Sequence, residues 1–376
     1  MESVYIVSAV RSPLGKAGKG SFANMRIDDL AAEVVKAAIA QVPGLNPNMI
    51  EDVMLGCAMP EGEQGLNIAR NVSFLAGIPV SSAAVTINRF CASSLESVMQ
   101  ASRAIMCGDG DIFVTGGVES MSHVPMGGFN PSLNEKLMMP GAPSAYIGMG
   151  ETAEILAEKY GISRGEQDQF ALSSHVKAVR AIKEGYFKQE IVPVGISADE
   201  GPREDTSLEK LAALKPAFKA NGTVTAGNSS QMTDGAAVVI LMSKSRAKKL
   251  GIKPVAKIIS MAVAGCDPAT MGEGPIFAVP KALNRAGMKL KNIDLVELNE
   301  AFASQSLSVV KALSLDPARL NVHGGAIALG HPLGASGARL VATMIGAMRA
   351  HNKKTGLVTL CVGGGQGAAL VLERMS

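Results

Sequence analysis

Two cysteines stand at positions where a thiol could do chemistry. Cys91 lies in INRFCASSLES, after a predicted strand and at the start of a predicted helix. The unpaired N–H groups and the dipole of such a helix start favour a thiolate. Cys361 ends the apolar run of LCVGGGQGAAL, and the glycines after it expose N–H groups that can stabilise negative charge on a substrate oxygen. A single cysteine is more often a buried structural residue, so these two gain meaning only from their neighbours.

Two other polar residues could act together with these thiols. His331 lies between Gly330 and Pro332 in GHPLG, and the proline stiffens the backbone that aims the imidazole. An imidazole beside a thiol activates it as a nucleophile, although a histidine here could equally pack in the core. Asn299 ends a predicted strand and begins NEAF, where it could cap the following helix or hold a water or an oxyanion.

The elements that must position these residues alternate between strands and helices, which is typical of an α/β protein. The predicted strands span 4–9, 51–56, 85–88, 111–117, 236–243, 254–260, 292–299 and 356–365. The predicted helices span 28–41 and 276–286, and two more follow Cys91 and the glycine-rich turn after His331. A length of 376 residues indicates two or three domains.

The last third of the chain repeats the order of elements found in the first third. MIEDVMLG (49–56) and NIDLVELN (292–299) match even in the short loop before the strand. Such self-similarity predicts two like-folded halves that pack together. If a pseudo-twofold axis relates the halves, the helix starts near Cys91 and His331 face one another, and the two residues form a pair.

An insertion separates the two halves. Residues 121 to about 222 begin with SHVPMGGFNPSLNEKLMMPGAPSAYIGMG, where Pro, Gly and Asn occur at the density of turns. A predicted helical stretch follows at 151–184, so we expect a loop-rich lid. The segment GMGETA (148–153) matches G-x-G-x-x-A, but no firm strand precedes it, and a dinucleotide site is therefore not expected.

Composition excludes several classes of function. The net charge of +3 comes from mixed charges without a basic block, so a nucleic-acid partner has no support. No apolar stretch approaches the roughly 20 residues of a membrane span, and MESVYIVSAV lacks a secretory leader. The five cysteines include no C-x-x-C pair, and the five histidines have no metal-site spacing, so neither a disulfide framework nor a metal site is expected. We expect a cytoplasmic protein, or a mitochondrial matrix protein in a eukaryote.

Taken together, the motifs resemble those of thiolases, in particular the degradative 3-ketoacyl-CoA thiolases (acetyl-CoA acyltransferases). The matching segments are NRFCASS, MGETAE, DEGPRED, TVTAGNSSQMTDGAA, NEAF, GGAIALGHPLGASGAR and CVGGGQG, and they extend over nearly the whole chain. The resemblance implies an α/β fold of two βαβαβαββ halves in five layers, α-β-α-β-α, with two parallel-rich mixed sheets around a central helix layer. It also implies a first half at 1–120 plus 223–250, a loop domain at 121–222 over the CoA site, and a second half at 251–376.

The resemblance also implies a role for each site residue. Cys91 would be the nucleophile that becomes acylated, His331 the base that activates it and later the CoA thiol, and Cys361 the acid and base at the α-carbon of acetyl-CoA. Asn299 would hold a water that forms one oxyanion hole with His331, and the N–H groups of Cys91 and Gly363 would form the other. The residues that would contact CoA or the acyl chain are Ser230, Met149, Met271 and Phe302.

The implied activity is thiolytic cleavage of 3-ketoacyl-CoA to acetyl-CoA and a shortened acyl-CoA in fatty acid β-oxidation. It would follow a ping-pong mechanism through an acyl-cysteine, with CoA as a substrate and no permanently bound cofactor. Three alternatives stay open: a biosynthetic acetoacetyl-CoA thiolase that condenses two acetyl-CoA, a ketoacyl-ACP synthase, and a non-catalytic acyl-CoA-binding scaffold subunit. A homodimer or tetramer is expected, and a hydratase/dehydrogenase subunit is a possible partner.

Two departures from the family pattern bear on these expectations. Ala92 follows the nucleophile where family members often have C-G-S or C-S-S, which adds a methyl group near the pocket. Gly148 stands where short-chain thiolases commonly carry a histidine, and the loop after ESMS is shorter and less basic than theirs. The second departure favours longer acyl chains and weakens the expectation of a tetramer.

Overall fold

The strands form one ten-stranded sheet in the computed structural model, which describes residues 1–375. Along the sheet they follow the order β4-β3-β5-β6-β1-β7-β10-β9-β8, and β2 pairs with β6 outside this path. The first half contributes β1 (Val4–Arg11), β2 (Gly15–Lys16), β3 (Asp52–Gly56), β4 (Ala83–Ile87), β5 (Ile112–Glu119) and β6 (Thr233–Ser243). The second half contributes β7 (Ala256–Gly265), β8 (Leu295–Leu298), β9 (Thr355–Val362) and β10 (Gln366–Arg374).

The strand order reads the same in both directions from the centre of the sheet. Outward from β1 the strands are β6, β5, β3 and β4, and outward from β7 they are β10, β9 and β8. In the first half, β4 pairs in parallel with β3. In the second half, Leu320 occupies the equivalent position, because it forms a parallel bridge with Val296 of β8. Each half therefore repeats the same arrangement, which confirms the predicted duplication.

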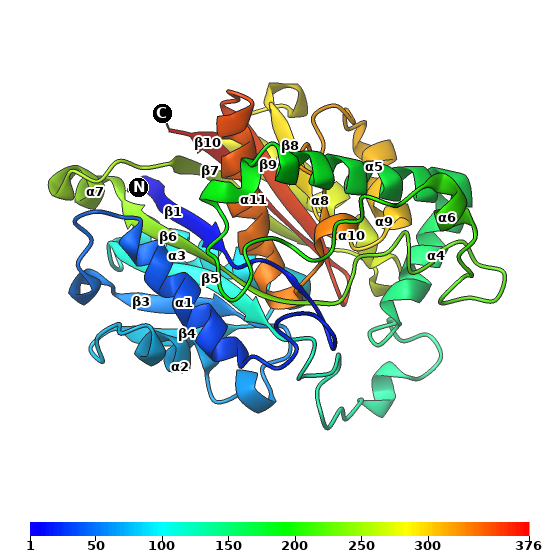
Figure 1. The fold of residues 1–376 in the computed structure, drawn as a ribbon, viewed down its shortest axis with the longest axis horizontal. Helices are drawn as coiled ribbons and strands as arrows, with labels where there is room; N and C mark the ends of the chain where they lie inside the picture. The colour runs from blue at the N-terminus through cyan, green and yellow to red at the C-terminus, as the bar shows by residue number, and fades with distance from the viewer. Residues whose placement is uncertain (376) are drawn as a thin grey trace.

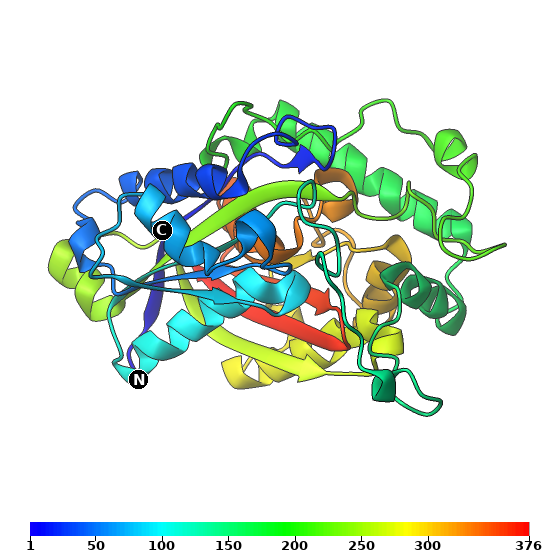
Figure 2. The ribbon, with the colours of Figure 1, turned by 90° about the horizontal axis from the view of Figure 1, so that it is seen from below.

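Two expectations about the sheets are wrong. β1 and β7 pair at Tyr5–Lys257 and Ile6–Ala256, which joins the sheets of the two halves into one. Among the described strands, parallel pairing is limited to β3–β4, β3–β5 and β8–β9, so the sheet is not rich in parallel strands. The reason is that the last strand of each half, β6 or β10, runs antiparallel to both of its neighbours. Figure 2 shows β10 beside β7.

The strand predicted at 356–365 ends earlier, at Val362. Gly364 and Gly365 have φ angles of 76° and 81°, a left-handed conformation that glycine adopts without strain. The chain turns back there and forms β10, a strand that the sequence analysis missed. Because β10 runs antiparallel beside β9, it covers one side of the backbone at Cys361.

The helices lie in three layers: one covers the outer face of each half of the sheet, and the third lies between the two halves. α1 (Ile27–Ala40) and α2 (Ile68–Leu75) pack on the outer face of the first half, and α8 (Gly274–Ala286) and α9 (Ala303–Leu313) pack on that of the second. Between the inner faces lie α3 (Ser93–Cys107) and α11 (Ser336–Ala350), which share one apolar core with both halves of the sheet (Figure 1). Twelve of the 15 residues of α11 are buried, as expected for a helix covered on all sides. The five-layer arrangement is thus the expected one.

The two central helices approach each other through small residues. A Cβ atom on Gly337 of α11 would lie 2.5 Å from the backbone N and 2.6 Å from the Cβ of Leu95 of α3. On the other side of α3, a Cβ on Gly56 would lie 2.3 Å from the backbone N of Ser94. The backbone N–H of Ala338 donates a 3.0 Å hydrogen bond to the Ser94 hydroxyl. The N-terminal turns of α3 and α11 therefore face each other, as the predicted pseudo-twofold packing requires.

The insertion carries two long helices rather than one. The helix predicted at 151–184 divides into α4 (Met149–Lys159) and α5 (Arg164–Lys183), so that prediction is wrong at the junction. Gly161 has a φ of 56°, and Ser163 then caps α5 through a reciprocal pair of contacts with Glu166. In Figure 1, α4 lies at the right of the molecule, and α5 runs across the upper part of the second half.

Three short helices complete the fold. They are α6 (Leu208–Ala212), α7 (Lys244–Leu250) and α10 (Ala326–Leu329). None of the helices between residues 1 and 375 combines the length and apolarity needed to cross a membrane.

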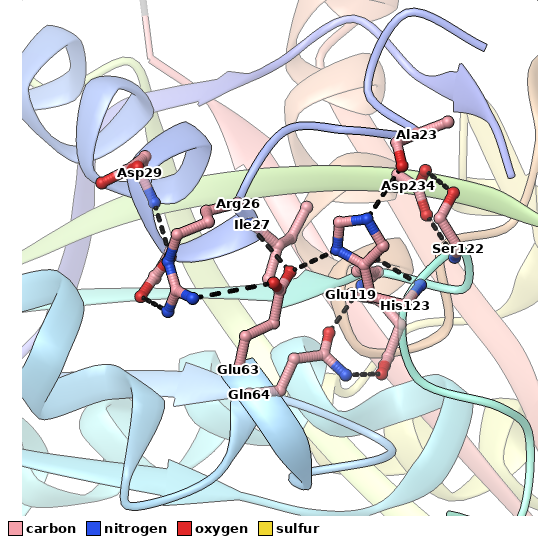
Figure 3. Close-up of polar contacts among 12 residues, drawn as sticks. Ala23, Arg26, Ile27, Asp29, Glu63, Gln64, Glu119, Ser122, His123 and Asp234 are labelled. Carbon is pink, nitrogen blue, oxygen red and sulfur yellow. Dashed lines mark hydrogen bonds and ion pairs between the residues drawn. The ribbon is translucent and has the colours of Figure 1, made fainter. Parts of the chain in front are cut away.

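Polar contacts hold the start of the insertion to the first half (Figure 3). The backbone N–H and the hydroxyl of Ser122 both donate to the carboxylate of Asp234, at the start of β6. The imidazole of His123 lies 2.9 Å from a Glu63 carboxylate oxygen and 2.8 Å from the carbonyl oxygen of Ala23. The hydrogen bond to Glu63 raises the pKa of His123. The boundaries of the three predicted domains stay a prediction.

Substituting Gly337 with alanine tests the close approach of the central helices. We expect Gly337→Ala to lower the free energy of unfolding by about 1–3 kcal/mol, because the new methyl group would overlap the backbone of Leu95. Urea denaturation measures the effect. Gly165→Ala is the matched control: it also lies in a helix, but no atom lies within 4 Å of the added methyl group. Equal stabilities of the two variants would contradict the tight contact.

Candidate active site

A strained turn presents the thiol of Cys91. The residue lies in the 3-10 turn η3 (Phe90–Ala92), directly before α3, and is 9% exposed. Phe90 has a φ of 42°, which is unusual for a residue with a side chain. Asn88 and Ser93 hold this conformation: the Phe90 N–H donates to the Asn88 side chain, and the Ser93 hydroxyl donates to the Phe90 carbonyl. The surrounding hydrogen bonds thus fix the direction of the Cys91 side chain.

The resting Cys91 is a neutral thiol. The backbone N–H of Gly363, in the turn between β9 and β10, lowers the pKa of this thiol. Burial nevertheless raises the pKa of Cys91 to about 11, more than the N–H groups of Gly363 and of Cys91 itself lower it. The N–H group of Cys91 at the helix start does favour the thiolate, as expected, but burial outweighs it. The physical reason is that the cost of desolvating the anion exceeds the gain from the N–H donors, so nucleophilic attack requires a base.

His331 is arranged as such a base. It lies between α10 and α11, and its Nδ1 contacts the hydroxyl of Ser336. That hydroxyl already donates its hydrogen to the carbonyl of Pro332 at 2.7 Å, so its oxygen accepts the Nδ1–H and leaves Nε2 unprotonated. Burial, and secondly the positive charge of Arg339, lowers the pKa of His331 to about 3. The imidazole is therefore neutral at physiological pH and offers a lone pair at Nε2.

Asn299 lies beside that lone pair. Its side-chain Nδ2 is 3.3 Å from Nε2 of His331, and its Oδ1 accepts a 3.4 Å hydrogen bond from Arg339. The alternative role as a helix cap is wrong, because α9 starts at Ala303 and its N-cap position is Phe302. The amide is fully buried and directed toward the imidazole instead.

Cys361 lies near the end of β9 and is buried. Burial first, and then the proximity of Cys91, raises the pKa of Cys361 well above its usual range. The two sulfurs are thus close enough for the charge on one to oppose the ionisation of the other. Three of the predicted ligand-contacting residues, Met149, Met271 and Phe302, pack with Cys361 in one apolar cluster.

Ser230 lies beside this cluster, and the next residue in the chain lines a cavity. The backbone N–H of Ser230 donates to the carbonyl of Ala301, and the preceding Ser229 bridges to Phe302. Gln231 lines a cavity of about 230 Å³, whose wall also includes Arg203, Lys210 and Asp205. Lys210 pairs with Asp205 at 2.8 Å, so Arg203 is the cation of this wall that has no carboxylate partner in the same wall.

Sequence reasoning missed several residues that support the site. Ser336 sets the tautomer of His331, and the signal for it was a hydroxyl at the start of the helix after GHPLG. Glu119 accepts hydrogen bonds from the N–H groups of Ala58, at 2.8 Å, and Gly334, at 2.7 Å, and so links the two halves. Arg339 was detectable as the charged residue on the inner part of an otherwise apolar helix.

Family models match both halves. Residues 4–245 match the model described as "Thiolase, N-terminal domain", and residues 252–374 match "Thiolase, C-terminal domain". The chain belongs to the thiolase family. The sequence-based resemblance is thereby confirmed, and the fold described above is the thiolase fold.

Individual relatives of this thiolase agree with that assignment. It is 49% identical to the 3-ketoacyl-CoA thiolase of Bacillus subtilis (strain 168), over 99% of this chain and 100% of that protein. It is also 49% identical to the 3-ketoacyl-CoA thiolase of Shewanella loihica, over 100% of both chains. Among solved structures, the acetyl-CoA acetyltransferase of Bacillus anthracis matches with a TM-score of 0.92 and 41% identity, over 100% of this chain and 99% of that chain.

The pH dependence of alkylation tests the neutral state of Cys91. Because its pKa is about 11, we expect the rate of iodoacetamide labelling at Cys91 to rise about tenfold per pH unit from pH 7 to about 9, without a plateau. Mass spectrometry of the Cys91 peptide measures the rate. The exposed Cys107 reports reagent reactivity in the same sample. A labelling rate at Cys91 that stays constant over this range would show a resting thiolate.

Proposed function

We propose that this thiolase cleaves 3-ketoacyl-CoA with CoA to give acetyl-CoA and a shortened acyl-CoA. Two observations support the proposal: the amide of Asn299 contacts the neutral imidazole of His331, and the buried thiol of Cys361 is influenced by the charge of Cys91. The names of the relatives support the same activity. CoA is a substrate here, and the proposal requires no permanently bound cofactor.

The first half-reaction would transfer the acyl group to Cys91. Nε2 of His331 accepts the proton of Cys91, and the sulfur attacks the C3 carbonyl of the substrate. The bond between C2 and C3 then breaks, and its electron pair forms the enolate of acetyl-CoA. The thiol of Cys361 donates its proton to the α-carbon of this enolate. Acetyl-CoA leaves, and Cys91 carries the acyl group as a thioester.

Two oxyanion holes would stabilise the negative charge that develops on oxygen. The N–H groups of Cys91 and Gly363 would form one of them, and the fact that both lower the pKa of the Cys91 thiol supports this arrangement. Asn299 forms the other together with His331, through a water that the amide holds. Because these donors are fixed before the substrate arrives, they stabilise the charge without reorganising.

The second half-reaction would release the acyl group to CoA. The imidazolium of His331 first passes its proton to the thiolate of Cys361, and the neutral imidazole then accepts the proton of the CoA thiol. The CoA sulfur attacks the thioester and expels the thiolate of Cys91. The imidazolium returns its proton to Cys91, which restores the resting enzyme.

The surface beside Ser230 would hold the rest of CoA. The pantetheine arm would pass Ser230, and Arg203 in the wall of the cavity next to Gln231 would face the negatively charged phosphates. Met149, Met271 and Phe302 line the end near the reacting carbonyl, where apolar contacts suit an acyl chain.

The degradative direction is the one that the relatives favour. The curated relatives at 49% identity are named 3-ketoacyl-CoA thiolase, whereas the structure named acetyl-CoA acetyltransferase is 41% identical. A biosynthetic acetoacetyl-CoA thiolase stays the second candidate. A scaffold without catalysis is disfavoured because all four chemical groups are present. The oligomeric state, a hydratase/dehydrogenase partner and a cytoplasmic location stay predictions.

A chain-length profile tests the substrate class. We expect kcat/KM to be higher for 3-ketoacyl-CoA substrates of about six to sixteen carbons than for acetoacetyl-CoA, since each added methylene gains binding in an apolar pocket. Cleavage is followed by the loss of absorbance of the 3-ketoacyl-CoA enolate. A strong preference for acetoacetyl-CoA would overturn the assignment to longer chains.

Cysteine substitutions separate the two thiols. We expect Cys361→Ala to lower the rate of thiolysis by about 10²–10⁴-fold, because the enolate then lacks its acid. This variant should still accept an acyl group on Cys91 from a simple acyl-CoA, whereas Cys91→Ala should not. Intact-protein mass spectrometry detects the acyl group, and Cys107→Ala serves as the control. Normal thiolysis by Cys361→Ala would disprove the role of Cys361.

A further inference from the structure

A buried arginine lies behind the pair formed by His331 and Asn299. Arg339 is on α11, one turn after Ser336, and has no exposed surface. One terminal nitrogen, Nη2, donates to Oδ1 of Asn299 at 3.4 Å. The other, Nη1, lies 3.8 Å from the carboxylate of Glu297. Within residues 1–375, Nε and Nη1 have no hydrogen-bond partner.

The charge of Arg339 is costly at this position. A guanidinium removed from water loses free energy unless acceptors satisfy its five N–H groups. Neighbouring buried positions of the same helix hold Leu340, Val341 and Met344, so an apolar side chain would suit the core. Glu297 lies beyond hydrogen-bond distance and compensates the charge only in part. A partly compensated charge beside Asn299 and His331 therefore points to a role in the site.

The contact with Asn299 decides which way the amide faces. A guanidinium can only donate hydrogen bonds, so it selects the oxygen of the amide and directs Nδ2 to the other side. On that side lies Nε2 of His331, which accepts hydrogen bonds. A rotated amide would place two acceptors against each other. Ser336 and Arg339, one turn apart on α11, thus set the orientations of His331 and Asn299 respectively.

We propose that Arg339 is a positioning residue, which holds the nitrogen of the Asn299 amide toward the reacting oxygen and adds positive charge behind the oxyanion that forms there. The inference rests on the proposed thiolase reaction. Helix α11 would then carry both orienting side chains: Ser336, which orients His331, and Arg339, which orients Asn299. The negative charge that develops on the reacting oxygen would then balance the positive charge of Arg339, which Glu297 balances only in part.

The charge environment of Arg339 supports this role. Burial lowers the pKa of Arg339, and the charges that face it are Glu297 on β8, Glu300 after β8, Glu190 after the 3-10 turn η5 (Tyr186–Gln189) and Arg11 on β1. The positive charge of Arg339 is the second cause, after burial, of the lowered pKa of His331. Removing that charge should raise the pKa of His331, so protonation should disable the base at a higher pH than in the wild type.

Two substitutions of Arg339 test the proposal, with the exposed arginine at the end of the same helix as control. We expect Arg339→Gln to lower kcat about 10–100-fold with less than about a threefold change in KM, because the lost interaction acts on the transition state. The acid limb of its kcat/KM profile should move to higher pH. Arg339→Lys keeps the charge without the planar fork, so it should lose kcat by a smaller factor and leave the acid limb in place. Arg349→Gln should match the wild type.

A double-substitution cycle separates positioning from general damage. In an Asn299→Ala background, Arg339→Gln should lower kcat by a clearly smaller factor than in the wild-type background, because the amide that it orients is gone and only its charge still acts. Fully multiplicative losses would overturn the proposal. If Arg339→Gln does not fold by circular dichroism, Arg339→Lys decides: a wild-type kcat in that variant overturns the role.

The activity of the wild type separates a failure of the proposed thiolase function from a failure of the proposed role of Arg339. An inactive wild type on 3-ketoacyl-CoA would overturn the proposed function and this inference with it. An active wild type, with Arg339→Gln equal to Arg349→Gln, overturns this inference alone.

Discussion

The contact between Gly337 and the backbone of Leu95 is the constraint on which the site depends. It lets α3 and α11 meet without an intervening side chain, and both helices then begin at the same place between the two halves of the sheet. Residues that precede the helices, Cys91 and His331, are carried there by the same packing. Glu119 reinforces the arrangement, because it accepts N–H groups from both halves. The geometry of the thiols is thus a consequence of helix packing rather than of any local loop.

In the proposed reaction the two halves contribute unequally to the chemistry. The first half would supply Cys91, and the second would supply His331, Asn299 and Cys361, each from a different element. The duplicated architecture gives both halves a central helix with a buried start, and the two starts carry different groups. Pairing across the axis therefore provides a nucleophile and its base without requiring them to be near in sequence.

Much of the fold and of the site could be predicted from the sequence, and the errors have physical causes. Strand and helix periodicity identified the duplication, and the motifs singled out Asn299 and His331, whose side chains lie 3.3 Å apart. The break at Gly161 was missed because helical patterning continues on both sides of it. The junction of β1 with β7 depends on tertiary contacts that no local pattern records. The net ionisation of Cys91 could not be predicted, because a helix start is visible in the sequence whereas the extent of burial is not.

Burial of Cys91 has a further consequence for the life of the enzyme. Peroxide and other electrophiles attack sulfur mainly in its anionic form. A thiol that holds its proton until a substrate and His331 act on it is shielded from such damage during the idle part of each cycle. Burial of the Cys91 sulfur makes proton transfer to His331 necessary, and in the proposed mechanism the same burial protects this sulfur between turnovers.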